Sequence, residues 1–301
     1  MSVANIREAR GAAPPAISFE FFPPKTDAQA VLLDETVARL SRFRPKYVSV
    51  TYGAGGTTQD RSLGTVRRMH ELGLATAAHL TCAGSTRDAL AHTIGLFREV
   101  GIERFVALRG DPPGGLTVPY EPHPLGYRDT AQLVETLKLA GATEVSVSAY
   151  PEKHPQSADW DAEIGALKRK VDAGADRAIT QFFYDNDLFE RFVERVRIAG
   201  IGIPIVPGIM PIHRFASICT FAGRCGTTIP ESLARRFDGL DPEQETHGLV
   251  AAAVASEQMA DLVTRGVEAF HIYTLNRAEL TEAACRALGV APEEGAAACA
   301  A

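Results

Sequence analysis

Short apolar runs alternate with longer amphipathic stretches along almost the whole chain. The short runs are rich in β-branched and aromatic residues and predict strands at 17–21, 46–51, 75–81, 104–110, 144–150, 177–183, 203–209 and 268–274. The longer stretches have helical periodicity and predict helices at 28–42, 60–72, 86–100, 129–140, 159–173, 187–199, 212–222 and 277–288. Two further helices are expected near 230–236 and 243–265, between the seventh and eighth strands.

Eight strand–helix units in succession predict an α/β fold with a parallel sheet, because neighbouring parallel strands need a crossover connection. Eight is also the number that closes a (β/α)8 TIM barrel. An open, doubly wound sheet is the alternative, but its first strand normally leads into a glycine-rich turn. Here the first strand leads into Phe-Pro-Pro-Lys at 22–25. We therefore expect a flexible segment at 1–15, and a single barrel domain over 16–301 with extra helices between strands seven and eight.

Composition and charge narrow the class of protein. The 301 residues suit one barrel with additions, since such barrels run to roughly 250 residues. The net charge of −6 gives no support for binding to nucleic acid or membrane surfaces. The apolar run at 249–255 is far shorter than the ~20 residues that span a bilayer. The five cysteines form no CxxC pair, which favours reduced thiols and a cytoplasmic location.

Polar side chains stand at the carboxyl ends of several predicted strands, where barrels of this class carry their active sites. A barrel without a site would fill these positions mainly with Val, Ile and Leu. The polar residues are Glu20, Ser49, Thr51, His79, Thr81, Arg109, Asp111, Tyr150, Gln181 and Tyr273. A ring of such residues at one end of the barrel predicts an active site.

Glu20 is the sharpest candidate in this ring. Alternation along 17–21 puts Phe19 and Phe21 on one face of the strand and Glu20 on the other. Both faces of a barrel strand are buried, and we expect no basic residue beside Glu20. A carboxyl group that is desolvated without a cationic partner has a raised pKa and can serve as a general acid. The alternative is a structural ion pair with an arginine such as Arg109, and the pattern favours neither.

Other motifs are weak when taken alone. The run Leu-Lys-Arg-Lys at 167–170 could bind a pyrophosphate, although a solvated helix face is the commoner meaning. The glycine-rich loop at 51–56 fits neither the GxGxxG nor the P-loop pattern, but it would suit a flat ring lying against backbone. Single histidines such as His79 and His154 do not form a metal-binding pattern, so no metal site is expected.

Many of these segments, in their order along 17–290, resemble the methylenetetrahydrofolate reductase family. They include SFEFFPPK (18–25), VSVTYGAGG (48–56), ALRGD (107–111), LKRKVDAGADRAITQFFYD (167–185) and YTLNRAE (273–279). The resemblance implies a barrel that binds FAD noncovalently and takes hydride from NADH, or from NADPH. It further implies reduction of 5,10-methylenetetrahydrofolate to 5-methyltetrahydrofolate, a step of one-carbon metabolism and methionine biosynthesis.

The resemblance also implies roles for individual residues. Glu20 matches a general acid that protonates the folate and assists opening of its five-membered ring. Asp111, Gln181 and Arg277 match residues that bind the folate, and Asp111 also contacts the flavin. The other positions that match contacts to FAD or the nicotinamide are Thr51, Tyr52, Ala54, His79, Arg109, Gly110, Tyr150, His154, Glu163, Arg169, Lys170 and Phe221.

The chain departs from the family pattern in two regions. Glu163 and Ala166 replace an aspartate and an asparagine that help to hold the adenosine half of FAD. The segment 112–129 is longer than usual and rich in proline, and Tyr127 is our candidate there for a flavin contact.

The expected partners are the folate substrate, a nicotinamide nucleotide and further copies of the chain in a homo-oligomer, with neither nucleic acid nor membrane. Two other enzymes fit the same residues: a flavin-independent reductase of the same fold, and an enzyme that runs in reverse and oxidises methyltetrahydrofolate. A folate methyltransferase would need zinc- or cobalamin-handling residues, which we do not find. A non-catalytic carrier would have no use for a buried Glu20.

Overall fold

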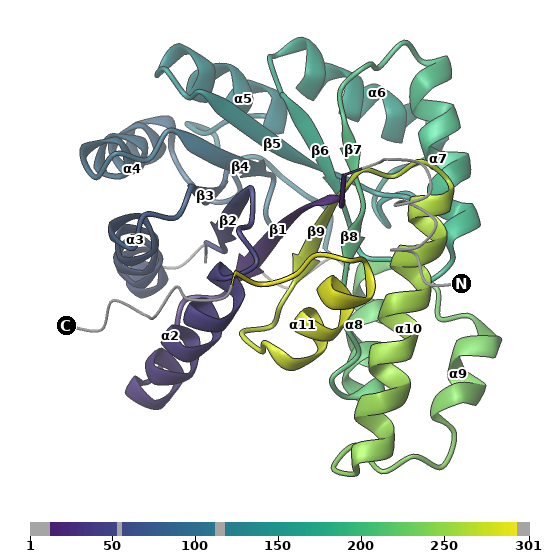
Figure 1. Ribbon diagram of the computed structural model, residues 1–301. Coiled ribbons are helices and arrows are strands. Elements are labelled where there is room, and N and C mark those ends of the chain that lie inside the picture. Colours follow the sequence, from purple (N-terminus) through teal and green to yellow (C-terminus); the bar gives the residue numbers. More distant parts are fainter. Residues whose placement is uncertain (1–12, 53–55, 112–117, 294–301) are drawn as a thin grey trace.

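The computed structural model describes residues 13–52, 56–111 and 118–293, in which parallel strands form a closed barrel surrounded by helices (Figure 1). The strands are β1 (Ala16–Phe21), β2 (Tyr47–Val50), β3 (Thr76–Thr81), β4 (Arg104–Leu108), β5 (Glu144–Ala149), β6 (Arg177–Thr180), β7 (Ile205–Val206), β8 (Gly208–Ile209) and β9 (Ala269–Tyr273). Their order in the sheet is β7-β6-β5-β4-β3-β2-β1-β9-β8. Because β7 and β8 follow each other in the chain, the two ends of the sheet meet. The expected (β/α)8 barrel is confirmed.

The seventh predicted strand, 203–209, is divided by Pro207, which has no N–H to donate to a sheet ladder. On one side of the proline, β7 pairs with β6. On the other side, β8 pairs with β9, and the Pro207 carbonyl accepts a hydrogen bond from the His271 N–H at 3.1 Å. The two short strands therefore together take the place of one barrel strand, and they close the barrel.

The helices follow the predicted positions closely. They are α2 (Asp27–Ser41), α3 (Gly56–Glu71), α4 (Arg87–Glu99), α5 (Thr130–Leu139), α6 (Trp160–Asp172), α7 (Asn186–Ile198), α8 (Phe215–Cys225), α9 (Glu231–Phe237), α10 (Glu245–Thr264) and α11 (Glu279–Ala287). Side chains that accept a hydrogen bond from the first turn fix the starts of α2, α4, α5, α6 and α7, which is why these boundaries could be read from the sequence.

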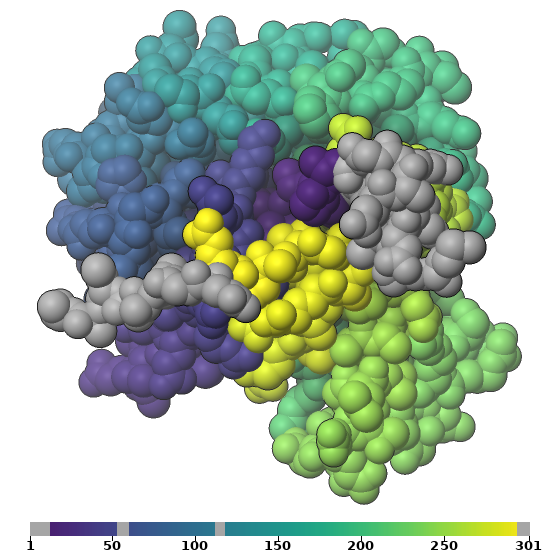
Figure 2. Space-filling model, in the orientation of Figure 1, coloured from purple at the N-terminus to yellow at the C-terminus, as the bar shows by residue number. Residues whose placement is uncertain are grey.

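The described residues form two large hydrophobic clusters and a third, small one of Tyr47, Ala77, Val106 and Ile179. The larger lies between the strands and the surrounding helices and contains the fully buried Phe19, Phe21 and Phe105. The smaller of the two large clusters contains buried residues of α8, α9 and α10, among them Phe237, whose ring stacks on that of Phe215 with centres 4.7 Å apart. In the space-filling view α9 and α10 form a light-green lobe beside the barrel (Figure 2). Within the described residues, every helix is too short or too polar to span a bilayer.

Candidate active site

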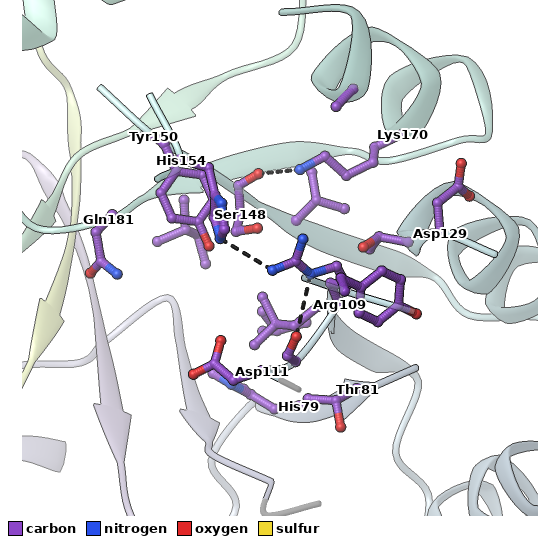
Figure 3. Close-up of a pocket in the computed structure, with 18 of the residues that line it drawn as sticks. His79, Thr81, Arg109, Asp111, Asp129, Ser148, Tyr150, His154, Lys170 and Gln181 are labelled. Atoms are coloured by element: carbon purple, nitrogen blue, oxygen red, sulfur yellow. Dashed lines mark hydrogen bonds between the residues drawn. The ribbon is translucent and has the colours of Figure 1, made fainter. Parts of the chain in front are cut away.

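A cavity of about 730 Å³ opens at the carboxyl ends of the strands, within the size range of sites for small ligands and cofactors. Figure 3 shows side chains from several strands and their following loops converging on it. The predicted site residues that line it are Glu20, Thr51, Tyr52, His79, Arg109, Gly110, Asp111, Tyr150, His154, Glu163, Arg169, Lys170, Gln181 and Phe221. The fold thus brings residues from Glu20 to Phe221, far apart in the sequence, to one cavity.

Three predicted residues need separate description. Arg277 is exposed at the start of the segment leading into α11 and is not part of the cavity wall. Ala54 lies outside the described residues. Tyr127 is buried in the hydrophobic core, with the Arg87 guanidinium 5.2 Å from its ring centre. Our expectation that Tyr127 faces a ligand is therefore wrong; Tyr120 of the same segment lines the cavity instead.

Glu20 lies between two histidines. Its Oε2 is 3.4 Å from Nε2 of His271 on β9 and 3.5 Å from Nε2 of His79 on β3. The expectation of no basic residue beside Glu20 is therefore wrong, since strands distant in sequence supply both rings. The proposed ion pair with Arg109 is also absent from the described structure, because the Arg109 guanidinium donates to Gln156 Oε1 at 2.7 Å.

Burial disfavours the charged form of two groups near Glu20, His79 and Tyr273. Burial lowers the pKa of His79, although the charge of Glu20 opposes that effect. Burial also raises the pKa of the Tyr273 hydroxyl well above its usual value, and this hydroxyl donates to the Thr180 carbonyl at 2.7 Å. Neither His79 nor Tyr273 is a permanent cation, and a general acid needs surroundings that do not hold its carboxyl group in the ionised form.

The side of the cavity formed by α6 and the segments after β4 and β5 carries basic side chains. Lys170 donates to the Ser148 carbonyl at 2.5 Å, and burial lowers its pKa to about 8. His154 lies 3.4 Å from the Arg109 guanidinium, and burial together with the charges of Arg109 and Lys170 lowers its pKa to about 4 (Figure 3). A neutral His154 therefore stands among the cations of Arg109, Arg169 and Lys170, a set suited to phosphate oxygens.

The orientation of α6 decides which charges of the run 167–170 reach the cavity. Leu167 is buried in the core, and Arg169 and Lys170 line the cavity. Lys168 lies on the outer face, where it pairs with Asp172 at 3.0 Å. The run is therefore partly a solvated helix face and partly a wall of the site.

Glu163 holds the loop that follows β5. Its Oε2 accepts hydrogen bonds from the His154 N–H at 3.0 Å and from the Ser157 hydroxyl at 2.6 Å. The side chain is only 6% exposed, so these bonds form away from competing water. Glu163, one of the two departures from the family pattern, therefore fixes the position of His154 in this chain.

Several features of the wall suit a flat, polar heterocycle. The hydroxyl of Thr81 is buried without a hydrogen-bond partner in the described structure, and buried polar groups of this kind are normally satisfied by a ligand or water. Gly110 has φ +82°, and a Cβ there would lie 2.9 Å from the Cβ of Thr81. Glycine therefore allows close approach of the backbone. Together with the basic side, these residues fit the expected FAD.

Sequence reasoning missed three residues that shape the site. Tyr120 packs its ring 4.8 Å from the Arg109 guanidinium, and Gln156 binds that guanidinium directly. His271 is fully buried beside Glu20. Only His271 carried a usable signal, because it alternates with Tyr273 along the strand run 268–274 and so shares its inward face. Among the described residues, His, Cys, Asp and Glu side chains form no cluster of three or more that could hold a metal ion.

Comparison with known proteins gives a consistent family. The model of the family described as "Methylenetetrahydrofolate reductase" matches residues 5–289. The 5,10-methylenetetrahydrofolate reductase of Escherichia coli is 44% identical over 277 residues, covering 92% of this chain and 91% of that protein. The enzyme of the same name from Pectobacterium carotovorum is 43% identical over 280 residues, with the same coverage.

More distant similarities agree with the fold. The maize protein "Methylenetetrahydrofolate reductase (NADH) 1" is 34% identical over 91% of this chain, which spans 48% of that longer protein. Among solved structures, an uncharacterised protein from Clostridium thermocellum that binds two copies of 5-methyl-5,6,7,8-tetrahydrofolic acid superposes with a TM-score of 0.61 at 14% identity. That match covers 95% of this chain and 98% of the other, and it supports the barrel architecture.

Proposed function

The chain belongs to the methylenetetrahydrofolate reductase family, and we propose that it reduces 5,10-methylenetetrahydrofolate to 5-methyltetrahydrofolate with a reduced nicotinamide nucleotide, by way of bound FAD. One observation carries the proposal beyond family membership. The buried carboxyl group of Glu20 and the cations of Arg109, Arg169 and Lys170 line the same cavity. A reductase of this kind needs both, because it must protonate a folate and anchor a dinucleotide.

The basic side of the cavity would hold the cofactor. Arg109, Arg169 and Lys170 supply positive charge for the pyrophosphate, and Arg109 is fixed in place by Gln156. Tyr150 and His154 form an edge-to-face pair with ring centres 4.7 Å apart, a rigid apolar wall for the adjoining part of the molecule. When bound, FAD would supply the redox chemistry, accepting hydride from the nicotinamide and passing it to the folate.

Glu20 supplies the proton. Its Oε2 donates to a ring nitrogen of methylenetetrahydrofolate, which weakens the bond from that nitrogen to the one-carbon unit and opens the five-membered ring. The one-carbon unit then has the character of an iminium ion and accepts hydride, while Glu20 is left as a carboxylate. The burial of Glu20, at 9% exposure, keeps bulk water from competing for the proton.

Asp111 and Gln181 orient the folate. Both line the cavity, and a carboxylate such as Asp111 accepts hydrogen bonds from the ring N–H groups of a pterin. Oε1 of Gln181 accepts from the Phe182 N–H at 3.0 Å, which leaves the NH2 group of the same side chain to donate to a ligand.

An absorbance spectrum of the purified protein tests this function. We expect absorbance peaks at ~380 and ~450 nm that bleach on anaerobic addition of NADH and return on addition of methylenetetrahydrofolate. A colourless protein that oxidises NADH in the presence of the folate would overturn the role of FAD and indicate direct hydride transfer. If the protein is a flavoprotein but the folate does not restore its bleached spectrum, the assignment of methylenetetrahydrofolate as the substrate would be overturned.

A further inference from the structure

A buried string of polar side chains continues from Glu20 into the barrel. His271 is 0% exposed; its Nε2 faces Glu20, and its Nδ1 lies 2.8 Å from the Ser18 hydroxyl. Tyr47 stacks against the His271 ring with centres 5.8 Å apart, and its hydroxyl is 3.5 Å from Nδ1. The ring is thus held on its face and at both nitrogens.

Counting hydrogens shows what this arrangement requires. The Ser18 hydroxyl lies 3.1 Å from the Phe270 carbonyl and 2.8 Å from Nδ1 of His271, and it also hydrogen-bonds with the Tyr47 hydroxyl. All three contacts are hydrogen bonds only if Ser18 donates to Phe270 and accepts from the Tyr47 O–H and from an Nδ1–H. Nε2 of the neutral ring is then an acceptor, facing the carboxyl oxygen of Glu20. A proton must therefore lie between Nε2 and Oε2, on the carboxyl group or on the ring.

We propose that His271, locked by Ser18, is the positioning residue that holds the transferable proton on Glu20. The proposal rests on the function proposed above and assigns a role to a residue that does not line the cavity. In the resting pair, Oε2 of Glu20 carries the proton and Nε2 accepts from it. When the folate takes that proton, His271 stays neutral with its hydrogen on Nδ1, and Glu20 alone changes charge.

The other groups near Glu20 do not offer the same arrangement. His79 is at a similar distance, but its Nε2 makes no hydrogen bond in the described structure. Arg177 has its guanidinium 4.9 Å from the centre of the Tyr47 ring, hydrogen-bonds with Tyr47 and pairs with Glu144 at 2.7 Å. Glu144 therefore compensates its charge, and Arg177 contacts the string at Tyr47.

The test compares the two half-reactions in His271→Gln. Glutamine can fill much of the same space, but it lacks the two ring nitrogens with which His271 contacts Ser18 and Glu20. We expect reduction of the bound flavin by NADH to stay within about twofold of wild type. Reoxidation of the flavin by methylenetetrahydrofolate should slow about 10- to 100-fold. The upper limit of that range equals the smallest rate loss expected when a general acid is removed completely. Loss of both half-reactions together, or of neither, would overturn the proposal.

A double variant separates a role through Glu20 from a general structural role. If His271 acts only through Glu20, then Glu20→Gln with His271→Gln will reoxidise no more slowly than Glu20→Gln alone. Independent structural damage predicts multiplied losses and would overturn the proposal. A wild-type protein whose reduced flavin is not reoxidised by the folate would overturn the proposed function. Normal folate reduction in Glu20→Gln would overturn the role of Glu20 as the acid, and an impaired Glu20→Gln beside a normal His271→Gln would overturn only the role of His271.

Ser18→Ala keeps the proposal testable if His271→Gln does not fold, because it removes only one oxygen atom. We expect a smaller loss, of about 3- to 10-fold, again confined to reoxidation by the folate. A normal rate of reoxidation in Ser18→Ala would contradict the role of the Ser18 hydrogen bond in fixing His271. His247→Gln is the matched control: His247 is also buried, at 3% exposure, but lies on α10 with its ring 5.0 Å from that of Phe237 in the smaller of the two large clusters, and both half-reactions should be unchanged.

Discussion

The side-chain amide of Asn276 pairs with the backbone of Phe22 in both directions. Its Oδ1 accepts from the Phe22 N–H and its Nδ2 donates to the Phe22 carbonyl, each at 2.9 Å. Beside this pair, the hydroxyl of Thr274 donates to the Glu20 carbonyl at 2.6 Å. The ladder between β1 and β9 ends with Glu20 opposite Tyr273, and these side chains extend it to the rim of the cavity. Glu20 is thus held on a fixed piece of backbone.

Replacing Asn276 should loosen this rim by two separable effects. Asn276→Gly removes the two hydrogen bonds and should cost about 1–2 kcal/mol of unfolding free energy. Asn276→Ala should cost about 1 kcal/mol more, because φ at this position is +56° and alanine is strained there. Denaturant unfolding of both variants provides the check. Equal losses of stability in the two variants would contradict the backbone strain expected for alanine. Wild-type stability in both variants would show that the two hydrogen bonds of Asn276 do not stabilise the fold.

Glu20→Gln should separate the two halves of the reaction. Glutamine has nearly the same shape but cannot give up a proton, so we expect folate reduction to fall by about 10²- to 10⁴-fold. Flavin reduction by NADH needs no proton from this residue and should be largely intact. Stopped-flow absorbance measures each rate. Glu20→Asp is the matched control, because it keeps the acid at a shorter reach and should fall between wild type and Glu20→Gln.

The fold was predictable because its determinants are local. Each strand run and the helix after it show their period within a dozen residues, and capping residues such as Thr86 and Asp159 mark helix starts. The division of the run 203–209 at Pro207 was overlooked, although a proline inside a strand run is a signal for such a break. The closure of the barrel then follows from the number of strand–helix units.

The surroundings of the site residues were harder to predict because they depend on register between distant strands. Glu20 and His271 are 251 positions apart, and nothing local to Glu20 indicates which side chain of β9 meets it. The choice between Tyr120 and Tyr127 depends on how one long loop folds back on the barrel. Strand ends give the position of a side chain along the barrel axis, whereas its neighbours around the barrel come only from the structure.

Gly110→Ala should damage the site without touching a charged group. The position has φ +82°, and a Cβ would come 2.9 Å from Thr81 and 3.3 Å from Ala83. We expect a loss of about 2–3 kcal/mol in unfolding free energy, from backbone strain and the displaced neighbours. Flavin affinity should fall as well, which a fluorescence titration would detect. Gly64→Ala on α3 is the control, since no atom lies within 4 Å of a Cβ there.

Lys170→Met should weaken the binding of FAD. The amine bonds to the Ser148 carbonyl at the basic side of the cavity, and a charged hydrogen bond to a phosphate is worth about 1.5–3 kcal/mol, or roughly 10- to 100-fold in affinity. Because the pKa of Lys170 is about 8 in the ligand-free protein, wild-type affinity should decline as pH rises through that value. Flavin titrations at several pH values test this. An equal decline in Lys170→Met would contradict the assignment to Lys170.

The same substitution should stabilise the ligand-free protein. Burial lowers the pKa of Lys170 from 10.5 to about 8, so between these values the unfolded chain binds a proton that the folded protein does not. Stability attributable to this group therefore rises with pH through that window, and the cost of the buried charge is fully present below about pH 8. At pH 7 we expect Lys170→Met to gain about 1–2 kcal/mol, measured by urea unfolding. A variant less stable than wild type would contradict this.

Stability at acid pH should depend on His213. Burial, followed by the charge of Arg277, lowers the pKa of His213 from 6.5 to about 4. Its Nε2 is buried and makes no hydrogen bond in the described structure, so the ring is held neutral. As pH falls below 6.5, the unfolded chain takes up a proton first, and stability is lost progressively down to about pH 4.

His213→Gln should remove that contribution. Between pH 6 and 4.5, the slope of unfolding free energy against pH should decrease by up to about 1.4 kcal/mol per pH unit, the contribution of one proton. Urea unfolding at a series of pH values measures the slope. Added salt should change the difference between wild type and variant little, because desolvation is its largest cause and is not screened. An unchanged slope in His213→Gln would show that this histidine is not held neutral by the fold.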